Sequence, residues 1–187
     1  MEAALKKEER YTYADYCAWP EWERWELIDG VAYAKDAPFE AHQSIVGEIY
    51  GQLSNFLLGK QCKVFLAPFS VRLNADTGDD TVVEPDILVV CDDSKRDGRG
   101  VVGAPDFIVE VLSPSTARHD RVTKLRLYQS SGVLEYWIVD PDAKTVTAHA
   151  LQGGAGYVKR EFDEHDAAAP VRVLDGCTID LAAVFNM

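Results

Sequence analysis

The chain has 187 residues, of which 47% are hydrophobic and 27% charged, and its formal net charge is −12. We expect one globular domain over residues 1–187, because this length and composition can bury a single good core. The acidic balance excludes a protein that coats nucleic acid non-specifically, since phosphate binding depends on clustered Lys and Arg. It does not exclude a nuclease, because screening limits surface fields to about 8 Å at physiological salt.

The location of the protein is predicted to be cytoplasmic. The apolar runs near residues 82–90 and 107–112 are too short for a membrane span and are interrupted by carboxylates. The N-terminal stretch MEAALKKEER lacks the apolar core of a secretory signal. Four cysteines without any CxxC pair predict reduced, mostly buried thiols and no structural zinc site: Cys17, Cys62, Cys91 and Cys177.

The first elements expected along the chain are a short helix, a hairpin and a long helix. Thr12 caps the short helix, which extends to residue 18. Asp29-Gly30 is typical of a tight hairpin turn. The long helix is predicted over residues 42–58, where apolar residues recur at helical spacing. Strands are expected over residues 22–27, 31–34, 62–66, 71–73, 87–90 and 107–112.

The second half is predicted to contain a βαβ unit and a further hairpin. Residues 93–100 are polar and contain glycine, which indicates a mobile loop. A helix over residues 117–130 ends near Gly132, and a β-rich run follows over 133–139. A hairpin over residues 146–162 and a short helix over 179–185 complete the chain. This order indicates an α/β domain whose sheet mixes parallel and antiparallel strands.

The segment Pro105–Ser113 carries a carboxylate inside an apolar strand. Glu110 shares one face of the strand with Ile108 and Leu112, and the other face is equally apolar. An unpaired buried carboxylate costs several kcal/mol, against about 1.5–3 kcal/mol for burying one large aliphatic side chain. Glu110 therefore needs a partner, which is an Arg, a Lys or a metal ion.

The segment Val83–Val90 repeats this anomaly at Asp86, which shares a face with Leu88. Taken alone, Asp86 is equally well interpreted as a turn residue at the start of a strand. If the strand is a neighbour of the one that carries Glu110, the two carboxylates repel each other unless a cation lies between them. Oxygen ligands of this kind suit Mg²⁺ or Mn²⁺ better than zinc.

The predicted second helix carries a lysine on the side that faces the sheet. Lys124, Leu127 and Tyr128 lie on one side of this helix at spacings of three and four. The ammonium of Lys124 can therefore reach the carboxylates, although a surface lysine with a packed stem is the alternative. Lys124 also belongs to the one local cationic cluster, which is either a solvated helix face or a phosphate-binding surface: Arg118, Arg121, Lys124 and Arg126.

This arrangement resembles the PD-(D/E)XK nuclease superfamily and, more closely, the Uma-type family of restriction-endonuclease-like proteins. The matching stretches are WELIDGVAY at residues 25–33, His42, VEPDILVV at residues 83–90 and the long segment Pro105–Pro141. Together they cover about residues 11–141. Each motif is weak alone, but their joint order and spacing are specific.

The resemblance implies the restriction-endonuclease-like fold, with a central mixed sheet flanked by helices, an N-terminal helix and hairpin, and C-terminal β additions. It implies that Asp86 and Glu110 bind Mg²⁺ or Mn²⁺, with the carbonyl of Val111 as a third ligand. The superfamily's lysine lies two residues after the Glu, where this chain has Leu112. Lys124 would supply the ammonium instead.

The resemblance also implies accessory residues and partners. Glu26 and His42 would border the site, although His42 is equally well explained as an ordinary residue at a helix start. Arg118 and Arg121 are the candidates for binding nucleic acid, which we expect to be DNA, and a homodimer is expected. Four further residues are interpreted as surface or strand-entry acids, helix capping or core packing: Glu48, Glu84, Asp120 and Tyr128.

Three functions remain open at this point. The first, which the carboxylates and the lysine favour, is a metal-dependent endonuclease that hydrolyses phosphodiester bonds. The second is a nuclease-like module that binds metal or nucleic acid with little or no catalysis, which the acidic net charge favours. The third is an interaction protein that retains the fold.

Overall fold

The computed structural model describes residues 10–20, 22–35, 37–153 and 156–186. No helix within these ranges is long and apolar enough to cross a membrane. The N-terminal stretch on which the predicted location depends lies outside the described residues except for Arg10. The elements follow in this order: α1 (Tyr13–Ala18), β1 (Trp25–Ile28), β2 (Val31–Ala34), α2 (Glu40–Leu57), β3 (Lys63–Leu66), β4 (Ser70–Arg72), β5 (Val82–Val83), β6 (Ile87–Val90), η1 (Asp93–Lys95), β7 (Gly100–Val102), β8 (Phe107–Val111), η2 (His119–Lys124), α3 (Leu125–Ser131), β9 (Glu135–Asp140), β10 (Thr145–Leu151), β11 (Tyr157–Asp163), β12 (Ala168–Pro170), β13 (Thr178–Asp180) and α4 (Leu181–Phe185).

Two mixed sheets form the framework. The larger has six strands in the order β11-β10-β9-β8-β6-β3, in which only β8 and β9 are parallel. The smaller has five strands in the order β2-β1-β5-β4-β7, in which only β4 and β7 are parallel. Strands β12 and β13 form a separate pair. The mixed sheet and the parallel β8–helix–β9 unit confirm the predicted fold class.

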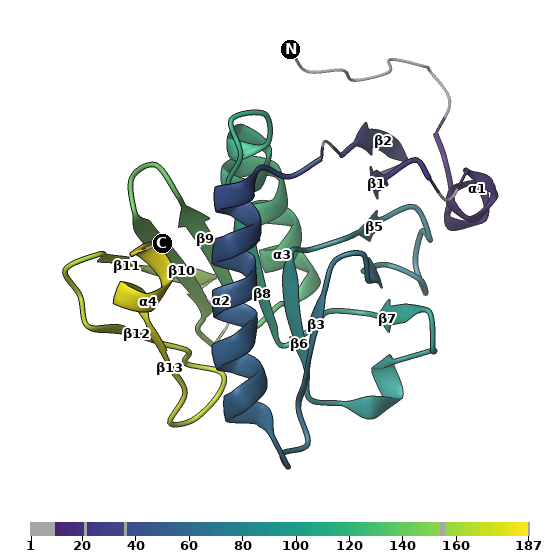
Figure 1. Cartoon of the computed structure of the whole chain (residues 1–187). Helices are drawn as coiled ribbons and strands as arrows, with labels where there is room; N and C mark the ends of the chain where they lie inside the picture. The colour runs from purple at the N-terminus through teal and green to yellow at the C-terminus, as the bar shows by residue number, and fades with distance from the viewer. Residues whose placement is uncertain (1–9, 21, 36, 154–155, 187) are drawn as a thin grey trace.

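Helices cover both faces of the six-stranded sheet. Figure 1 shows α2 crossing one face, with α4 on the same side and α3 behind the sheet. Because side chains alternate along β8, this strand packs against helices on both faces of the sheet. Phe107 and Val109 pack in the core cluster that contains the buried residues of α2 and α4, whereas Ile108 packs in the cluster that contains Tyr128 of α3.

The local signals at the N-terminus are confirmed. The Thr12 side chain accepts a hydrogen bond from the backbone N–H of Asp15, whose carboxylate in turn accepts from the Thr12 N–H, and this reciprocal cap starts α1. In the β1–β2 hairpin, Asp29 and Gly30 have φ values of 48° and 76°. A two-residue hairpin turn with both φ values positive follows the twist of its strands, which explains the Asp-Gly pair.

Three stretches differ from the prediction. The second helix begins with a π-helical segment, η2, before α3, and it ends where Gly132 adopts a φ of 85°. The expected loop at residues 93–100 contains the 3₁₀ turn η1, which Asp92 caps through the N–H of Ser94. Strands β5 and β7 have only two and three residues, so they carry too little alternation to be recognised from the sequence.

The prediction of four reduced cysteines is wrong for one pair. Cys62 and Cys91 form a disulfide, with their Cα atoms 3.9 Å apart. Cys62 directly precedes β3 and Cys91 directly follows β6. The β3–β6 register, in which Lys63 pairs with Val90, therefore places the two cysteines opposite each other. This pairing is long-range in the sequence, which is why spacing alone did not indicate it. Cys17 and Cys177 are free.

Candidate functional site

The site lies where the chain passes from the smaller sheet to the larger one. Residues 84–86 connect β5 with β6, so they join the two sheets directly. Strand β1 lies beside β5, with Leu27 opposite Val82. The backbone N–H of Glu84 donates to Oε1 of Glu26 at 3.0 Å. Glu26 is thereby held beside the segment that leads from β5 into β6.

Asp86 directly precedes β6, and Glu110 lies in the neighbouring strand β8, so the condition for repulsion between the two carboxylates is met. Strands β6 and β8 are antiparallel, with Ile87 opposite Val109, and extending this register by one residue places Asp86 opposite Glu110. The negative charge of Asp86 is among the factors that raise the pKa of Glu110, after burial and against the attraction of a nearby lysine. The two carboxylates therefore interact across the strands.

Asp86 is fixed by two donors through a single oxygen. Its Oδ2 accepts the backbone N–H of Val111 at 2.9 Å and lies 3.1 Å from Nε2 of His42. Burial disfavours the ionised form, but His42, a lysine charge and the Val111 N–H together lower the pKa of Asp86. His42 thus belongs to the site. Its Nδ1 is buried and has no hydrogen-bond partner among the described residues.

Lys124 lies at the centre of a buried acidic cluster. Its Nζ is 2.8 Å from Glu110, 2.9 Å from Glu26 and 3.5 Å from Asp120. Its side chain is only 4% exposed. Burial alone would lower the pKa of this ammonium, but the three carboxylates raise it well above the usual value. Lys124 is therefore charged and serves as the counter-ion of the cluster. Asp120 does not cap a helix but lies inside this cluster, contrary to the sequence interpretation.

Glu110 is paired with Lys124 and with Tyr128, whose hydroxyl donates to Oε1 at 2.9 Å. Tyr128 is therefore more than a core residue. Burial is the largest influence on this carboxyl and, together with the charges of Asp86 and Asp120, outweighs the attraction of Lys124. The pKa of Glu110 is raised to about 8. A second cation next to Glu110 would favour its ionised form.

At Glu26 the influences on the pKa favour the ionised carboxylate, in contrast to Glu110. Burial opposes its ionisation, but the charges of Lys124 and Lys35 and the N–H of Glu84 lower the pKa of Glu26 to about 2. Lys35 lies 3.4 Å from Glu26 Oε1 and donates to the backbone carbonyl of Glu84. The Glu84 side chain is also largely buried, with Arg24 at 3.1 Å. Glu84 is therefore not a surface acid, and it lies where the chain leaves β5 and approaches β6.

The donor set fits a divalent cation of the magnesium type. The hydrogen bonds of Glu26, Asp86 and Glu110 all fall on one oxygen of each carboxylate, and no described residue donates to the other. No group of three or more His, Cys, Asp or Glu side chains in the described ranges is arranged around one metal position. Mg²⁺ is usually held by one or two carboxylates and keeps several waters, so two free carboxylate oxygens are sufficient.

The structure brings together five of the residues predicted for the site, Asp86, Glu110, Lys124, Glu26 and His42, as the distances above show. Val111 adjoins them through its N–H. The two residues predicted to bind nucleic acid have other surroundings. Arg121 pairs with Asp140 at 2.7 Å, and Arg118 is exposed at the start of η2.

Lys35 is the principal site residue that the sequence argument missed. A signal for it was present in the hairpin. The Asp29-Gly30 turn fixes a register in which Glu26 pairs with Tyr33. Residues two apart on a strand share a face, so Lys35 is a diagonal neighbour of Glu26. Extending the register by these two residues would have placed a lysine at the site.

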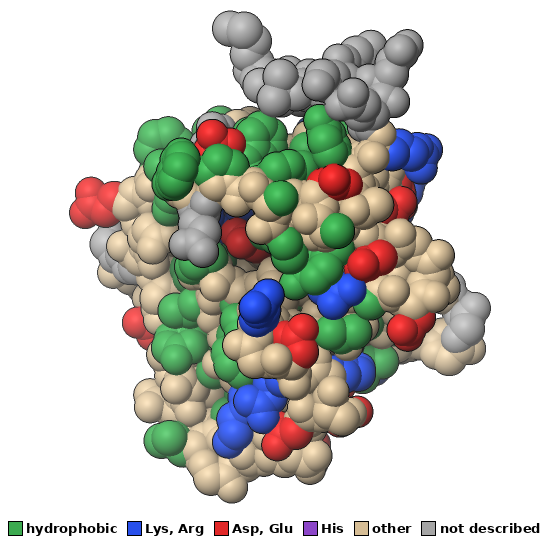
Figure 2. Space-filling view, turned by 90° about the vertical axis from the view of Figure 1, so that its right-hand side faces the viewer, with side chains coloured by type: hydrophobic (Ala, Val, Ile, Leu, Met, Phe, Trp, Pro, Cys, Tyr) green, Lys and Arg blue, Asp and Glu red, His purple; other side chains and the backbone are tan. Residues whose placement is uncertain are grey.

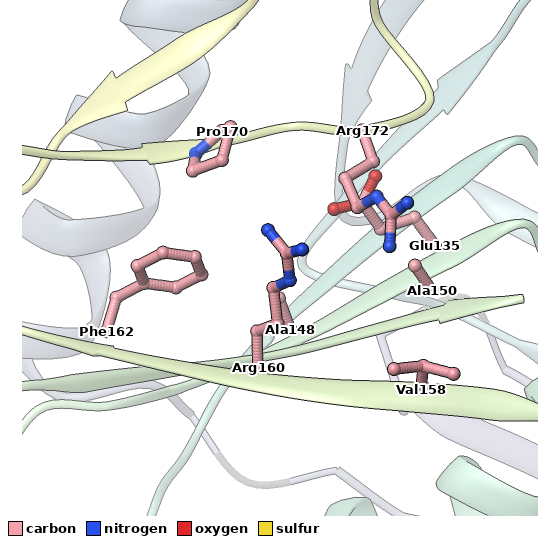
Figure 3. Close-up of a pocket in the computed structure, with 8 residues that line it drawn as sticks. All are labelled: Glu135, Ala148, Ala150, Val158, Arg160, Phe162, Pro170 and Arg172. Carbon is pink, nitrogen blue, oxygen red and sulfur yellow. The ribbon is translucent and has the colours of Figure 1, made fainter.

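A second group of charged side chains lies at β9 and β11 of the larger sheet, and its hydrogen bonds give it a structural role. Figure 3 shows Arg160 and Arg172 beside Glu135 in a small pocket. The Glu135 carboxylate accepts the Trp137 indole N–H at 2.7 Å and the Val173 N–H at 2.9 Å. The pocket has a free volume of about 10 Å³, which holds at most one water molecule. The Val173 bond joins β9 to the segment after β12, and the Trp137 bond lies within β9.

On the face seen in Figure 2, the basic side chains do not form one continuous surface. Figure 2 shows acidic and basic side chains interspersed among hydrophobic ones on the side of the molecule that is at the right in Figure 1. This distribution agrees with the net charge of −12. On this face, recognition of a phosphate would therefore depend on individual cations rather than on a broad basic surface.

The fold and the carboxylate–lysine cluster define a protein of the restriction-endonuclease-like class. A similar solved structure is described as a "putative nuclease belonging to DUF820" from Anabaena variabilis. It is 22% identical, has a TM-score of 0.76, and the match covers 94% of this chain and 98% of that one. The chain belongs to the Uma2 family, described as "putative restriction endonuclease", whose model matches residues 13–182.

A relative of the chain is an uncharacterized protein of Synechocystis, 31% identical over 127 residues. The match covers 67% of this chain and 65% of that protein. The chain therefore spans somewhat less than two thirds of the length of this relative.

Proposed function

We propose that the protein is a divalent-metal-dependent nuclease that hydrolyses phosphodiester bonds in DNA. The observation that carries the proposal is the pair Asp86 and Glu110, which lie opposite each other on buried neighbouring strands beside the ammonium of Lys124. Membership in a family described as "putative restriction endonuclease" supports it.

In this proposal the free oxygens of Asp86 and Glu110 hold Mg²⁺ or Mn²⁺, and the Val111 carbonyl is a further ligand. A bound ion would supply Lewis-acid chemistry, polarising the phosphate and lowering the pKa of a nearby water. The chain's own residues prepare this position. His42 and the Val111 N–H orient Asp86, and Tyr128 and Lys124 orient Glu110. Lys124 balances the charge of the carboxylates.

The test is cleavage of supercoiled plasmid in the presence of Mn²⁺. Wild type is expected to convert plasmid to nicked or linear forms. Asp86→Asn and Glu110→Gln, which keep the side-chain shape but remove the charge, are expected to be inactive although folded. EDTA should stop the wild-type reaction. Cleavage by both variants at the wild-type rate would overturn the proposal.

A second candidate function is a module that binds metal or nucleic acid without turnover. It is favoured by the engagement of Glu110 with Lys124 and Tyr128 and by the acidic net charge. Mn²⁺ binding in calorimetry that Glu110→Gln abolishes, together with no cleavage by wild type, is the result that would select this function.

A further inference from the structure

Two lysines reach the carboxylates of the site, and their surroundings differ. Lys124 is fully enclosed, with carboxylates of Glu26, Glu110 and Asp120 around its Nζ. An ammonium has three N–H donors and no acceptor. Lys124 donates to Glu26 and Glu110, and its nearest further acidic group is Asp120 at 3.5 Å, so this ammonium is engaged by the carboxylates of the cluster.

Lys35 occupies the rim of the same cluster. Its side chain is 15% exposed, compared with 4% for Lys124. It donates to the Glu84 carbonyl and lies 3.4 Å from Glu26 Oε1. That oxygen is already bound more closely by Lys124, at 2.9 Å, and by the Glu84 N–H, at 3.0 Å. The pairing of Lys35 with Glu26 is thus the weakest at this oxygen.

Lys35 lies close to the chain segment that carries Asp86. Its ammonium donates to the backbone carbonyl of Glu84, two residues before Asp86, where the chain passes from β5 to β6. Lys35 follows β2, the edge strand of the smaller sheet, so a ligand can approach it from outside the cluster.

We infer that Lys35 is the catalytic lysine of this site, whose ammonium contacts the scissile phosphate, and that Lys124 is a positioning residue for the carboxylates. This inference rests on the proposed nuclease function. Phosphoryl transfer places negative charge on the non-bridging phosphate oxygens, and a cation held at those oxygens stabilises the transition state. Lys35, with a side chain 15% exposed, offers such a cation, whereas the side chain of Lys124 is only 4% exposed.

The test uses single-turnover cleavage of a labelled duplex oligonucleotide with Mn²⁺ at several protein concentrations, which separates the maximal rate from the half-saturating concentration. Lys35→Gln and Lys35→Met remove the charge, and Gln also keeps a hydrogen-bond donor for the Glu84 carbonyl. Lys35→Arg keeps the charge. Lys95→Ala is the matched control, because Lys95 likewise donates to a backbone carbonyl, that of Ala104 at 2.8 Å, beyond the opposite end of β6.

We expect both neutral variants to lose about 10²–10³-fold in maximal rate, the loss typical of one electrostatic stabiliser. Lys35→Arg should retain most of the rate, and Lys95→Ala should match wild type. A phosphate contact also contributes to the salt dependence of binding. The slope of log affinity against log salt concentration should therefore fall by about 0.9 in the neutral variants, which a purely structural lysine would not change.

The possible failures are distinguishable. If wild-type cleavage requires Asp86 and Glu110 but Lys35→Gln cuts at the wild-type rate, the nuclease function stands and the inference is wrong. If wild type neither cuts nor binds Mn²⁺, the function fails and the inference fails with it. If both neutral variants are unfolded while Lys35→Arg is folded, Lys35 is a structural ion-pair residue and the inference is again overturned.

Discussion

Replacing Lys124 by methionine should destabilise the protein more than any other single loss of charge at the site. Methionine has a similar length and fills the space, so the packing of the stem is largely kept. The variant leaves Glu26, Glu110 and Asp120 buried, each at most 3% exposed, without the ammonium that lies between them. Removing one partner of a buried ion pair costs about 3–5 kcal/mol, because the remaining charge stays desolvated.

This loss can be expressed as a melting temperature. For a domain of this size, 1 kcal/mol corresponds to about 2–4 °C, so Lys124→Met should melt about 6–20 °C below wild type. Thermal and urea unfolding in EDTA measure it. Arg126→Met is the control, since Arg126 lies exposed two residues further along the same helix and should change stability by less than about 0.5 kcal/mol.

A second substitution tests the cause. Glu110→Gln in the Lys124→Met background removes one of the unpaired carboxylates and should recover part of the lost stability, with a coupling free energy of about 0.5–3 kcal/mol. A Lys124→Met variant as stable as wild type, or losses that simply add in the double variant, would refute the described ion cluster. If Lys124→Met is destabilised as expected, a loss of activity in this variant can be assigned to catalysis only after its folded fraction has been measured.

Other predictions concern the metal, the disulfide and the core. Mn²⁺ at about ten times its dissociation constant should stabilise wild type by about 1.4 kcal/mol, or about 3–6 °C, and leave Glu110→Gln unchanged in a thermal shift assay; equal shifts in both proteins would contradict the ligand assignment. The disulfide Cys62–Cys91 closes a loop with a sequence separation of 29. Reduction with dithiothreitol should therefore lower the free energy of unfolding by about 3–4 kcal/mol in urea titrations, and an unchanged midpoint would argue against the bond. Leu53→Ala in α2, which is fully buried, should cost about 2–5 kcal/mol, whereas Leu58→Ala, at a residue 73% exposed, should cost less than about 0.5 kcal/mol. Similar unfolding midpoints for the two variants would contradict the packing of α2 on the sheet.

Local patterns in the sequence were sufficient for most of the fold. The Thr12 cap, the Asp29-Gly30 turn and the end of the second helix at Gly132 each depend on residues close together in the chain. The periodicity of β8 and β6 also identified the faces that carry Glu110 and Asp86. These features could be predicted because backbone geometry and side-chain alternation act over a few residues.

Long-range pairing could not be predicted in the same way. The disulfide depends on the β3–β6 register, and the ion cluster depends on Glu26 lying beside a helix that follows almost a hundred residues later, as the sequence separation of 98 between Glu26 and Lys124 shows. The sequence argument anticipated repulsion between Asp86 and Glu110 but left open which cation relieves it. The structure shows that Lys124 pairs with Glu110, and it adds Lys35, which sequence reasoning did not consider.

The central claim is that Asp86 and Glu110 hold a divalent cation. A crystal soaked in Mn²⁺ tests it most directly, because the anomalous signal of manganese locates the ion without reference to activity. The account predicts one strong peak within coordination distance of a carboxylate oxygen of Asp86 and of Glu110, with Lys124 still bound to Glu110 and Glu26. No peak at these two residues in the soaked crystal, or manganese bound only elsewhere on the molecule, would contradict it.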